Sequence, residues 1–461
     1  MKLQIAIPNI CISEQHYILN VMLTEFLGID FEVKIHEGEF IELTRPGSEK
    51  ILTINTEFFK KADQYWLETE SLPSLPLKIF KPSNDGLYAD LLPPTIPVLY
   101  GEPGIIKNKK YWHLNLDIFG SSFFMLSRYE EAVLQDRDQH DRFPATASIA
   151  FKEGFLNRPI VNEYVELLWA MMKALWPELE RKKRSFRMIL THDVDVPFEF
   201  NIKQIKIVKS IVGDILKRDS INLARKRFGQ WNAVRKGNYA ADPLYSFDFI
   251  MKESEKRGLK SAFYFIADHT AGVIDGIYSL NDPAIINLMK TIDARCHEIG
   301  VHTSYNTYLD KVQTRKEAEL LRAAMRKNSI HQEPQGGRQH YLRWKTPETF
   351  QNWEYAGMQY DTTLSYADCA GFRCGTCSEF SVYDLTSRKP LNLIERSLIA
   401  MEGTVISEGY MNKGLGEQAF EVFKSLKDTC RKYNGDFVLL WHNSALATEE
   451  QRRLYLSVLD C

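Results

Sequence analysis

The sequence has no long uninterrupted run of apolar residues, and this excludes a conventional membrane-spanning helix. Such a helix needs about 20 mostly apolar residues, whereas the most apolar helical stretch, residues 167–176, is interrupted by Lys173. Residues 1–8 also lack the long apolar core and small-residue cleavage site of a secretory signal. We therefore expect a cytoplasmic protein.

Neither sign of charge is in excess. The 58 lysines and arginines nearly balance 60 aspartates and glutamates, for a net charge of −2. A general nucleic-acid-binding protein would carry a basic excess, so this class is excluded. The one dense basic run, residues 181–184, is more simply interpreted as an exposed linker. With 461 residues and a hydrophobic share of 44%, the chain is expected to form two or three globular domains.

Cysteines are few and unevenly spread. Seven, an odd number, fit a reducing compartment better than a disulfide framework. Cys369, Cys374 and Cys377 follow the spacing that begins a plant-type iron–sulfur pattern. Cys430 is too distant to complete this pattern comfortably, and a second C-x-x-C pair for a zinc ribbon is missing. Free buried thiols are therefore favoured over a cluster, and a thiol-dependent redox protein remains an alternative.

The chain divides into three parts. Residues 1–150 mix helix-like and strand-like sequence patterns, which predicts a smaller α+β domain. They contain no chemical motif from which to derive a role. His140, Asp141 and Arg142 are interpreted as a solvated surface loop. Residues 151–184 read as a helical linker, with a helix over 162–174. Residues 185–461 are expected to form the second domain.

Short apolar strands alternate with amphipathic helices in residues 185–461, which predicts a parallel α/β architecture. The expected strands cover 186–190, 261–266, 298–302, 339–344 and 437–441. The expected helices cover 246–257, 283–296, 315–327, 347–356 and 416–433. In a parallel barrel, side chains at the carboxyl ends of the strands converge on one face. Polar residues follow several of these strands, so this face is the expected site.

The first of these strands ends in two aspartates. Because side chains alternate along a strand, Asp193 and Asp195 project to the same side while His192 points away. Two adjacent carboxylates raise each other's pKa unless a metal ion, an arginine or a shared proton separates them. Each of these three arrangements is found in active sites. An aspartate-rich turn before Pro197 is the alternative without a function.

Three further strings complete a pattern. They are His297-Glu298-Ile299-Gly300-Val301-His302-Thr303-Ser304-Tyr305-Asn306, Arg338-Gln339-His340-Tyr341-Leu342-Arg343-Trp344 and Leu439-Leu440-Trp441-His442-Asn443-Ser444. In order and strand-end placement, residues 185–461 resemble the polysaccharide deacetylases, the NodB-homology group of carbohydrate esterase family 4. The resemblance implies a distorted (β/α) barrel that removes N-acetyl groups from sugars with zinc or a related divalent ion. It is closest to a divergent branch with an amino-terminal domain of unknown function.

The resemblance also implies roles for the acid–base residues. Asp193 resembles the catalytic base that takes a proton from water, and His442 resembles the general acid. Arg338 stands where the family has an arginine bonded to that base, although Arg343 could equally face it. Asp361 resembles the aspartate that orients the general acid; Asp368 is the other candidate for this role.

The expected metal ligands are Asp195, His302 and Asn306. His302 matches the first histidine of the family's His-x-x-x-His motif, while Asn306 replaces the second. The i to i+4 spacing would place both side chains on one helical face. Zinc favours nitrogen and sulfur ligands, whereas an amide oxygen suits harder metal ions. The resemblance therefore favours Zn²⁺, with Mn²⁺, Co²⁺ or Mg²⁺ as alternatives, or a site that has lost its metal.

The expected substrate is an N-acetylated sugar. Residues near the strand ends are expected to contact it: Tyr305, His340, Tyr341, Arg343 and Trp344. A cytoplasmic location favours a glycan precursor in a bacterium, such as a lipid-linked or nucleotide-linked sugar, over a finished wall polymer. The competing hypothesis is a metal-free homologue that binds carbohydrate or acts as a scaffold.

Overall fold

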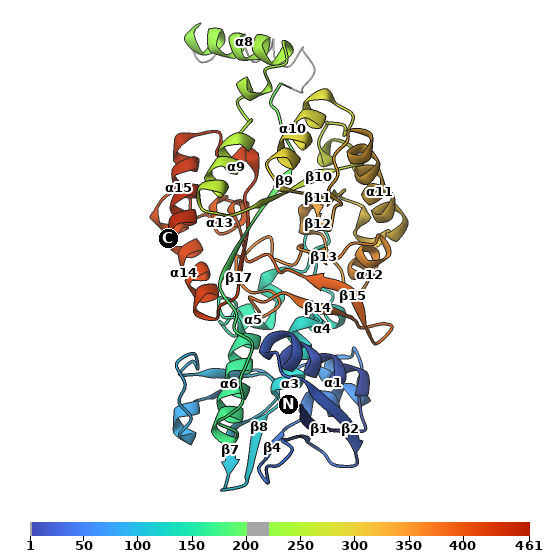
Figure 1. Ribbon diagram of the computed structural model, residues 1–461, viewed down its shortest axis with the longest axis vertical. Coiled ribbons are helices and arrows are strands. Elements are labelled where there is room, and N and C mark those ends of the chain that lie inside the picture. The colour runs from blue at the N-terminus through green and yellow to red at the C-terminus, as the bar shows by residue number, and fades with distance from the viewer. Residues whose placement is uncertain (1, 201–220) are drawn as a thin grey trace.

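The computed structural model describes residues 2–200 and 221–461, and it places two β-sheets one above the other (Figure 1). The lower sheet is formed by strands from the amino-terminal part of the chain, and the upper sheet is formed by strands from residue 187 onward. None of the helices in the described residues is long and apolar enough to cross a membrane.

The lower sheet is mixed and has six strands in the order β2-β1-β3-β4-β8-β7. Their bounds are β1 (Leu3–Pro8), β2 (Phe31–His36), β3 (Ile41–Thr44), β4 (Ile51–Ile54), β7 (Gly101–Lys107) and β8 (Tyr111–Leu116). A separate ribbon pairs β5 (Lys78–Phe80) with β6 (Ile96–Val98). The helices are α1 (Ile12–Leu19), which continues as a π-helix over Asn20–Leu27, then α2 (Glu57–Gln64), α3 (Ile118–Leu126), α4 (Tyr129–Val133), α5 (Ile149–Lys152) and α6 (Ile160–Leu175).

The upper sheet has nine strands in the order β14-β15-β13-β12-β11-β10-β9-β17-β16, and β14 is antiparallel to its neighbour. Their bounds are β9 (Arg187–Val194), β10 (Ser261–Ile266), β11 (Glu298–Thr303), β12 (Gly336–Gln339), β13 (Tyr360–Asp361), β14 (Phe380–Asp384), β15 (Lys389–Glu395), β16 (Ala400–Met401) and β17 (Asp436–Leu440). The helices are α8 (Ile221–Arg235), α9 (Phe247–Lys256), α10 (Pro283–Ala294), α11 (Lys311–Lys327), α12 (Glu348–Tyr355), α13 (Glu402–Ile406), α14 (Glu417–Lys432) and α15 (Glu449–Asp460).

The α/β class expected for the carboxyl-terminal part is confirmed, since helices alternate with parallel strands along most of this sheet. The sheet curls into a half-barrel, and within the described residues β14 and β16 remain its two free edges. The strand expected over 339–344 is wrong. It forms earlier as β12, and a short turn follows over His340–Leu342. This shift matters because His340 then directly follows the carboxyl end of a strand.

The two sheets are joined by a continuous buried core. Phe123 of α3 packs against Tyr383 of β14, with ring centroids 5.1 Å apart. A buried ion cluster adds to this core, in which Glu131 accepts hydrogen bonds from Arg128 at 2.9 Å and Arg373 at 2.5 Å. Because Arg373 lies between β13 and β14, these contacts join the amino-terminal part to the carboxyl-terminal part of the chain. The boundaries at 150 and 184 stay a prediction.

Candidate active site

Asp193 and Asp195 come from the carboxyl end of β9 and the turn after it. Both line one cavity, as strand alternation predicts. His192 turns the other way, where its Nδ1 lies 2.6 Å from the carbonyl oxygen of Trp441 and its ring stacks on Phe263. His192 is therefore part of the packing between strands, and the two carboxylates face the cavity.

The buried arginine beside Asp193 is Arg338 of β12. Its Nη1 donates to Asp193 Oδ1 at 2.8 Å, and its other N–H groups bond Thr191 Oγ1 and the Thr362 carbonyl oxygen. Burial alone would raise the pKa of Asp193, but the Arg338 charge and the nearby imidazoles of His302 and His442 outweigh it and hold the pKa below its ordinary value. Asp193 is thus kept ionised and fixed in orientation.

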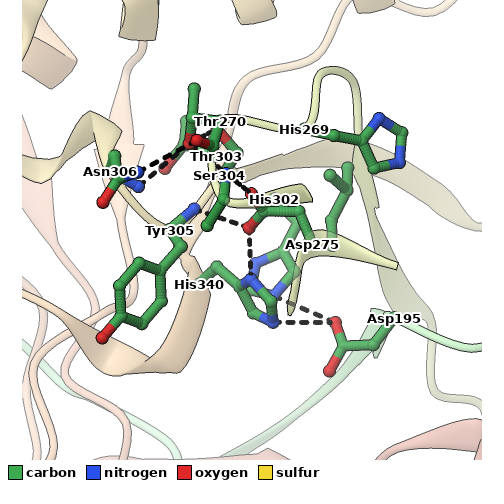
Figure 2. A network of polar contacts seen from close by, with 12 residues as sticks. Asp195, His269, Thr270, Asp275, His302, Thr303, Ser304, Tyr305, Asn306 and His340 are labelled. Carbon is green, nitrogen blue, oxygen red and sulfur yellow. Dashed lines mark hydrogen bonds and ion pairs between the residues drawn. The ribbon is translucent and has the colours of Figure 1, made fainter. Parts of the chain in front are cut away.

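Two imidazoles converge on Asp195 (Figure 2). His302 is the penultimate residue of β11, and its Nε2 lies 3.2 Å from Asp195 Oδ1, while His340 Nε2 lies 3.8 Å from the same oxygen. Although Asp195 Oδ1 and His302 Nε2 are buried, neither has a hydrogen-bond partner among the described residues. Orphaned buried atoms that face one another in this way are the arrangement expected of metal ligands.

The donor set fits a divalent cation. One oxygen of Asp195 and one nitrogen each of His302 and His340 lie within 4.8 Å of one another. The Nδ1 atoms are engaged elsewhere, His302 with the Arg338 carbonyl oxygen and His340 with Asp275 Oδ1, each at 2.8 Å. Such bonds fix the tautomer that leaves Nε2 free to bind a metal. Two imidazoles and a carboxylate suit zinc and related transition metals.

His442 follows β17 on the opposite side of Asp195. Its Nε2 lies 3.4 Å from Asp195 Oδ2, and its Nδ1 lies 2.5 Å from Glu402 Oε1. Burial would lower the pKa of His442, but the carboxylates of Glu402 and Asp195 outweigh burial and raise it well above its ordinary value. The imidazole is therefore held in its proton-bearing form, as a general acid requires.

These groups line a cavity of about 210 Å³. Apolar side chains of Leu342, Met401 and Leu440 form part of its wall. Tyr341 and Tyr410, each 39% exposed, form another part. The remaining wall residue is Arg142, which belongs to the amino-terminal part of the chain. The site therefore combines an ionised carboxylate, a charged imidazole and three metal-type donors around a space large enough for a small ligand.

Asn306 does not join this group. The expected helical pairing with His302 is wrong, because His302 lies in a strand and Asn306 lies in the exposed turn after it. The Asn306 amide donates to the Thr270 carbonyl oxygen at 3.0 Å, and its oxygen accepts from Arg343 at 3.3 Å. Figure 2 shows Asn306 turned away from Asp195. The third donor is His340, which the sequence analysis assigned to substrate.

Asp361 does not orient His442, so this expectation is wrong. Its carboxylate accepts hydrogen bonds from the backbone and hydroxyl of Thr363 instead, and burial raises its pKa to about 7. Glu402 holds the position that the sequence analysis gave to Asp361. Asp368 is also elsewhere, since it accepts from the backbone of Ala145 at 3.0 Å.

The expected substrate contacts divide into two sets. Tyr341 and His340 line the cavity. Arg343 instead lies between the rings of Tyr305 and Tyr308, at 4.0 and 3.9 Å from their centroids, and bonds the carbonyl oxygens of His140 and Tyr305. Trp344 is 1% exposed and packs on Phe350, so the prediction that it contacts substrate is wrong.

The three clustered cysteines do not form a metal site in the described residues. Cys374 and Cys377 are buried and Cys369 is partly buried. Burial raises the pKa of the Cys374 thiol to about 12, which disfavours the thiolate that a metal or a redox reaction needs. These residues therefore pack as small apolar side chains.

Three site residues were not identified from the sequence, namely Arg142, Asp275 and Glu402. Asp275 lies in a loop after β10 and is fully buried. Glu402 follows a strand of two residues, too short to leave a hydrophobic pattern. His340 could have been recognised as a ligand, because it lies near the carboxyl end of a strand as His302 and His442 do. The interpretation of Arg142 as a solvated loop residue is wrong, because contacts with the distant Tyr341 and Tyr410 bury it in the cavity wall.

Comparison with known proteins adds little to this geometry. Residues 3–177 match a family model described as a family of unknown function (DUF7033), which covers less than half of the chain. No curated protein matches the sequence. One similar structure is a "putative polysaccharide deacetylase" from Mycobacterium smegmatis, with 13% identity, a TM-score of 0.38 and coverage of 60% of this chain and 84% of that one. Another is Puue allantoinase, with 13% identity, a TM-score of 0.36 and coverage of 62% and 85%. Scores of this size do not establish a shared fold, so the site stands on its own contacts.

Proposed function

We propose that the protein is a metal-dependent hydrolase that removes an acyl group, most simply N-acetyl, from an amino sugar or a glycan precursor. The observation that carries this proposal is the meeting of three kinds of group in one cavity. These are the Asp193–Arg338 pair, the His442–Glu402 pair and the donor group of Asp195, His302 and His340.

Amide hydrolysis needs a base for the attacking water and an acid for the departing nitrogen. Asp193 accepts a proton from a water molecule while the water oxygen bonds to the acyl carbon. His442 donates a proton to the amine as the carbon–nitrogen bond breaks. Arg338 keeps the base ionised, and Glu402 keeps the acid charged. A divalent cation held by the three donors would lower the pKa of water from about 16 toward about 7 and polarise the acyl oxygen.

A sugar is the substrate favoured by the cavity wall. Tyr341 and Tyr410 offer aromatic and hydroxyl surface beside charged groups, a combination that suits the mixed polarity of a sugar ring. The resemblance of residues 185–461 to sugar N-deacetylases points to the same class. Within that class we propose a precursor, such as a lipid-linked or nucleotide-linked sugar or a short glycan.

The test is acetate release from N-acetylhexosamines by the purified protein supplied in turn with Zn²⁺, Mn²⁺ and Co²⁺. The Asp193→Asn variant is expected to lose about 10²- to 10⁴-fold in rate, because it lacks the general base. Asp248→Asn, at an exposed carboxylate on α9, serves as the matched control and should keep full activity. An Asp193→Asn variant as active as the wild type would sink the proposal. Sugar binding without turnover, in a protein that takes up no metal, would instead favour a carbohydrate-binding homologue.

A further inference from the structure

The amino-terminal part of the chain contributes a wall to the cavity through residues 138–142, the capping loop. This loop is a tight turn organised by Asp138. The Asp138 carboxylate accepts from the backbone N–H groups of His140 and Arg142, at 2.8 and 3.0 Å, and from Arg142 Nε at 2.8 Å. Asp141 takes a left-handed backbone conformation, with φ of 58°. The loop is therefore fixed in shape by its own bonds.

The capping loop is fastened to the turns that follow β11 and β12. Tyr305 OH lies 2.9 Å from His140 Nδ1, and Tyr308 OH donates to the Asp141 carboxylate. Arg343 donates to the His140 carbonyl oxygen at 2.8 Å. Because His302 lies in β11 just before the first turn and His340 opens the second, the loop borders the cavity that both histidines line.

Arg142 extends this contact into the cavity. Its Nη1 donates to the Tyr341 carbonyl oxygen at 2.9 Å, and its Nη2 lies 3.4 Å from Tyr410 OH. The side chain is 8% exposed, and its charge is balanced by Asp138 at 2.7 Å. Arg142 thus bridges two separate segments of the carboxyl-terminal part, and with Tyr341 and Tyr410 it forms one continuous side of the cavity.

A closed side limits the length of the substrate. A polymer that presents an internal sugar to Asp193 and His442 must leave the cavity in two directions, whereas a single or terminal sugar needs one opening. The volume of about 210 Å³ is also below the roughly 300–1,000 Å³ typical of pockets that hold drug-sized ligands. We propose that the capping loop restricts the enzyme to acylated amino groups on a single sugar or on the terminal sugar of a short glycan. This inference rests on the proposed function and gives the amino-terminal part its role.

The test compares N-acetylglucosamine with its β-1,4-linked tetramer as substrates of the full-length, metal-loaded protein. The wild type is expected to deacetylate the monosaccharide and a terminal ring of the tetramer, and to act on internal rings at least about tenfold more slowly in kcat/KM. Arg142→Ala opens the closed side, so it should reduce this preference about tenfold and allow internal rings to react. Gln139→Ala, at an exposed position of the same loop, is the control and should behave as the wild type.

Binding of both sugars, followed by saturation-transfer NMR, separates this inference from the proposed function. If acetate release is absent but the wild type still binds the monosaccharide and terminal rings in preference to internal rings, and Arg142→Ala loses that preference, the loop assignment stands and the hydrolase proposal fails. A wild type that deacetylates or binds internal rings of the tetramer as well as the monosaccharide overturns the assignment. So does a folded Arg142→Ala variant with unchanged preference, and failure to bind either sugar overturns both proposals.

Discussion

His340 and Asp275 form the most informative pair of residues in the site. Asp275 is fully buried and accepts hydrogen bonds from His340 Nδ1 at 2.8 Å and from the backbone of Ala271 and Tyr305, each at 2.7 Å. A carboxylate bonded to the far nitrogen of a histidine fixes its tautomer and increases its basicity as a ligand. Asp275 is thus a positioning residue for the metal-type donors.

The Asp275→Asn variant is expected to bind Zn²⁺ about 10- to 100-fold more weakly, because an amide cannot replace the carboxylate as the acceptor from His340. Competition with a chromophoric chelator measures this affinity. Asp268→Asn, which alters a carboxylate that pairs with Lys316 near the end of β10, is the matched control. Equal zinc affinity in the wild type and Asp275→Asn would refute the assigned role of Asp275.

In the proposed mechanism, Arg338 determines the acid limit of activity. Its charge lowers the pKa of Asp193, so the base stays ionised at pH values where an ordinary buried aspartate would be protonated. In Arg338→Gln the pKa of Asp193 rises, and the acidic limb of the kcat/KM profile should move to higher pH. Circular dichroism checks that the variant is folded. A folded variant whose acidic limb stays at the same pH would show that Arg338 does not lower the pKa of Asp193.

Sequence reasoning at this scale succeeds where a residue's partner is fixed by strand geometry. Asp193, Asp195 and His302 stand at the ends of apolar strands, and their meeting follows from parallel pairing. Sequence reasoning fails where the position of a side chain is set by an element too short to leave a sequence pattern. Glu402, rather than Asp361, reaches His442 because β16 pairs with β17 in a register that aligns Met401 with Leu440. Nothing in the local sequence indicates so short a strand.

At the scale of elements, β12 shows why a strand can be missed. It begins with Gly336 and Gly337, which give no apolar signal, and so the apolar pattern predicts the strand three residues late. The glycines are required by packing. A Cβ atom at position 337 would lie 1.8 Å from the Val301 carbonyl oxygen of β11, and one at position 336 would lie 2.3 Å from the Tyr360 carbonyl oxygen. The strands on both sides therefore leave room for hydrogen alone.

Gly337→Ala tests this packing. The new methyl group must push β12 away from β11, which is expected to cost at least about 1–3 kcal/mol of stability. It should also reduce activity, because Arg338 and His340 move with the strand. Thermal unfolding and acetate release measure the two effects. Gly409→Ala, at a position with open space around it, should leave both unchanged. A Gly337→Ala variant as stable as the wild type would contradict the strand placement.

At the scale of the whole molecule, the amino-terminal part and the upper sheet share one core. Glu131 lies between Arg128 and Arg373, and all three are almost completely buried. Composition predicts separate domains, and the mixed lower sheet and curled upper sheet agree with two kinds of architecture. The contacts between them, such as Arg128 with the Arg373 carbonyl oxygen, join residues 245 positions apart and leave no trace in local sequence.

Glu131→Gln removes the charge that two buried guanidinium groups share. Breaking a buried ion pair from one side typically costs about 3–5 kcal/mol, so the variant should unfold at a clearly lower temperature. The two parts should unfold together in the wild type, as one transition in calorimetry. Glu319→Gln, at an exposed pair on α11, is the control. Separate transitions in the wild type, or no loss of stability in Glu131→Gln, would show that the parts are energetically independent.

We expect Asp195, His302 and His340 to hold one divalent cation beside Asp193 and His442. A crystal structure of the protein prepared with Zn²⁺, with anomalous data collected at the zinc edge, will show whether they do. The expected result is a single strong peak bonded to a carboxylate oxygen of Asp195 and to Nε2 of both histidines, at about 2.0–2.2 Å. A zinc-saturated crystal with no peak among these three residues, or with the ion held by Asn306 instead of His340, would contradict it.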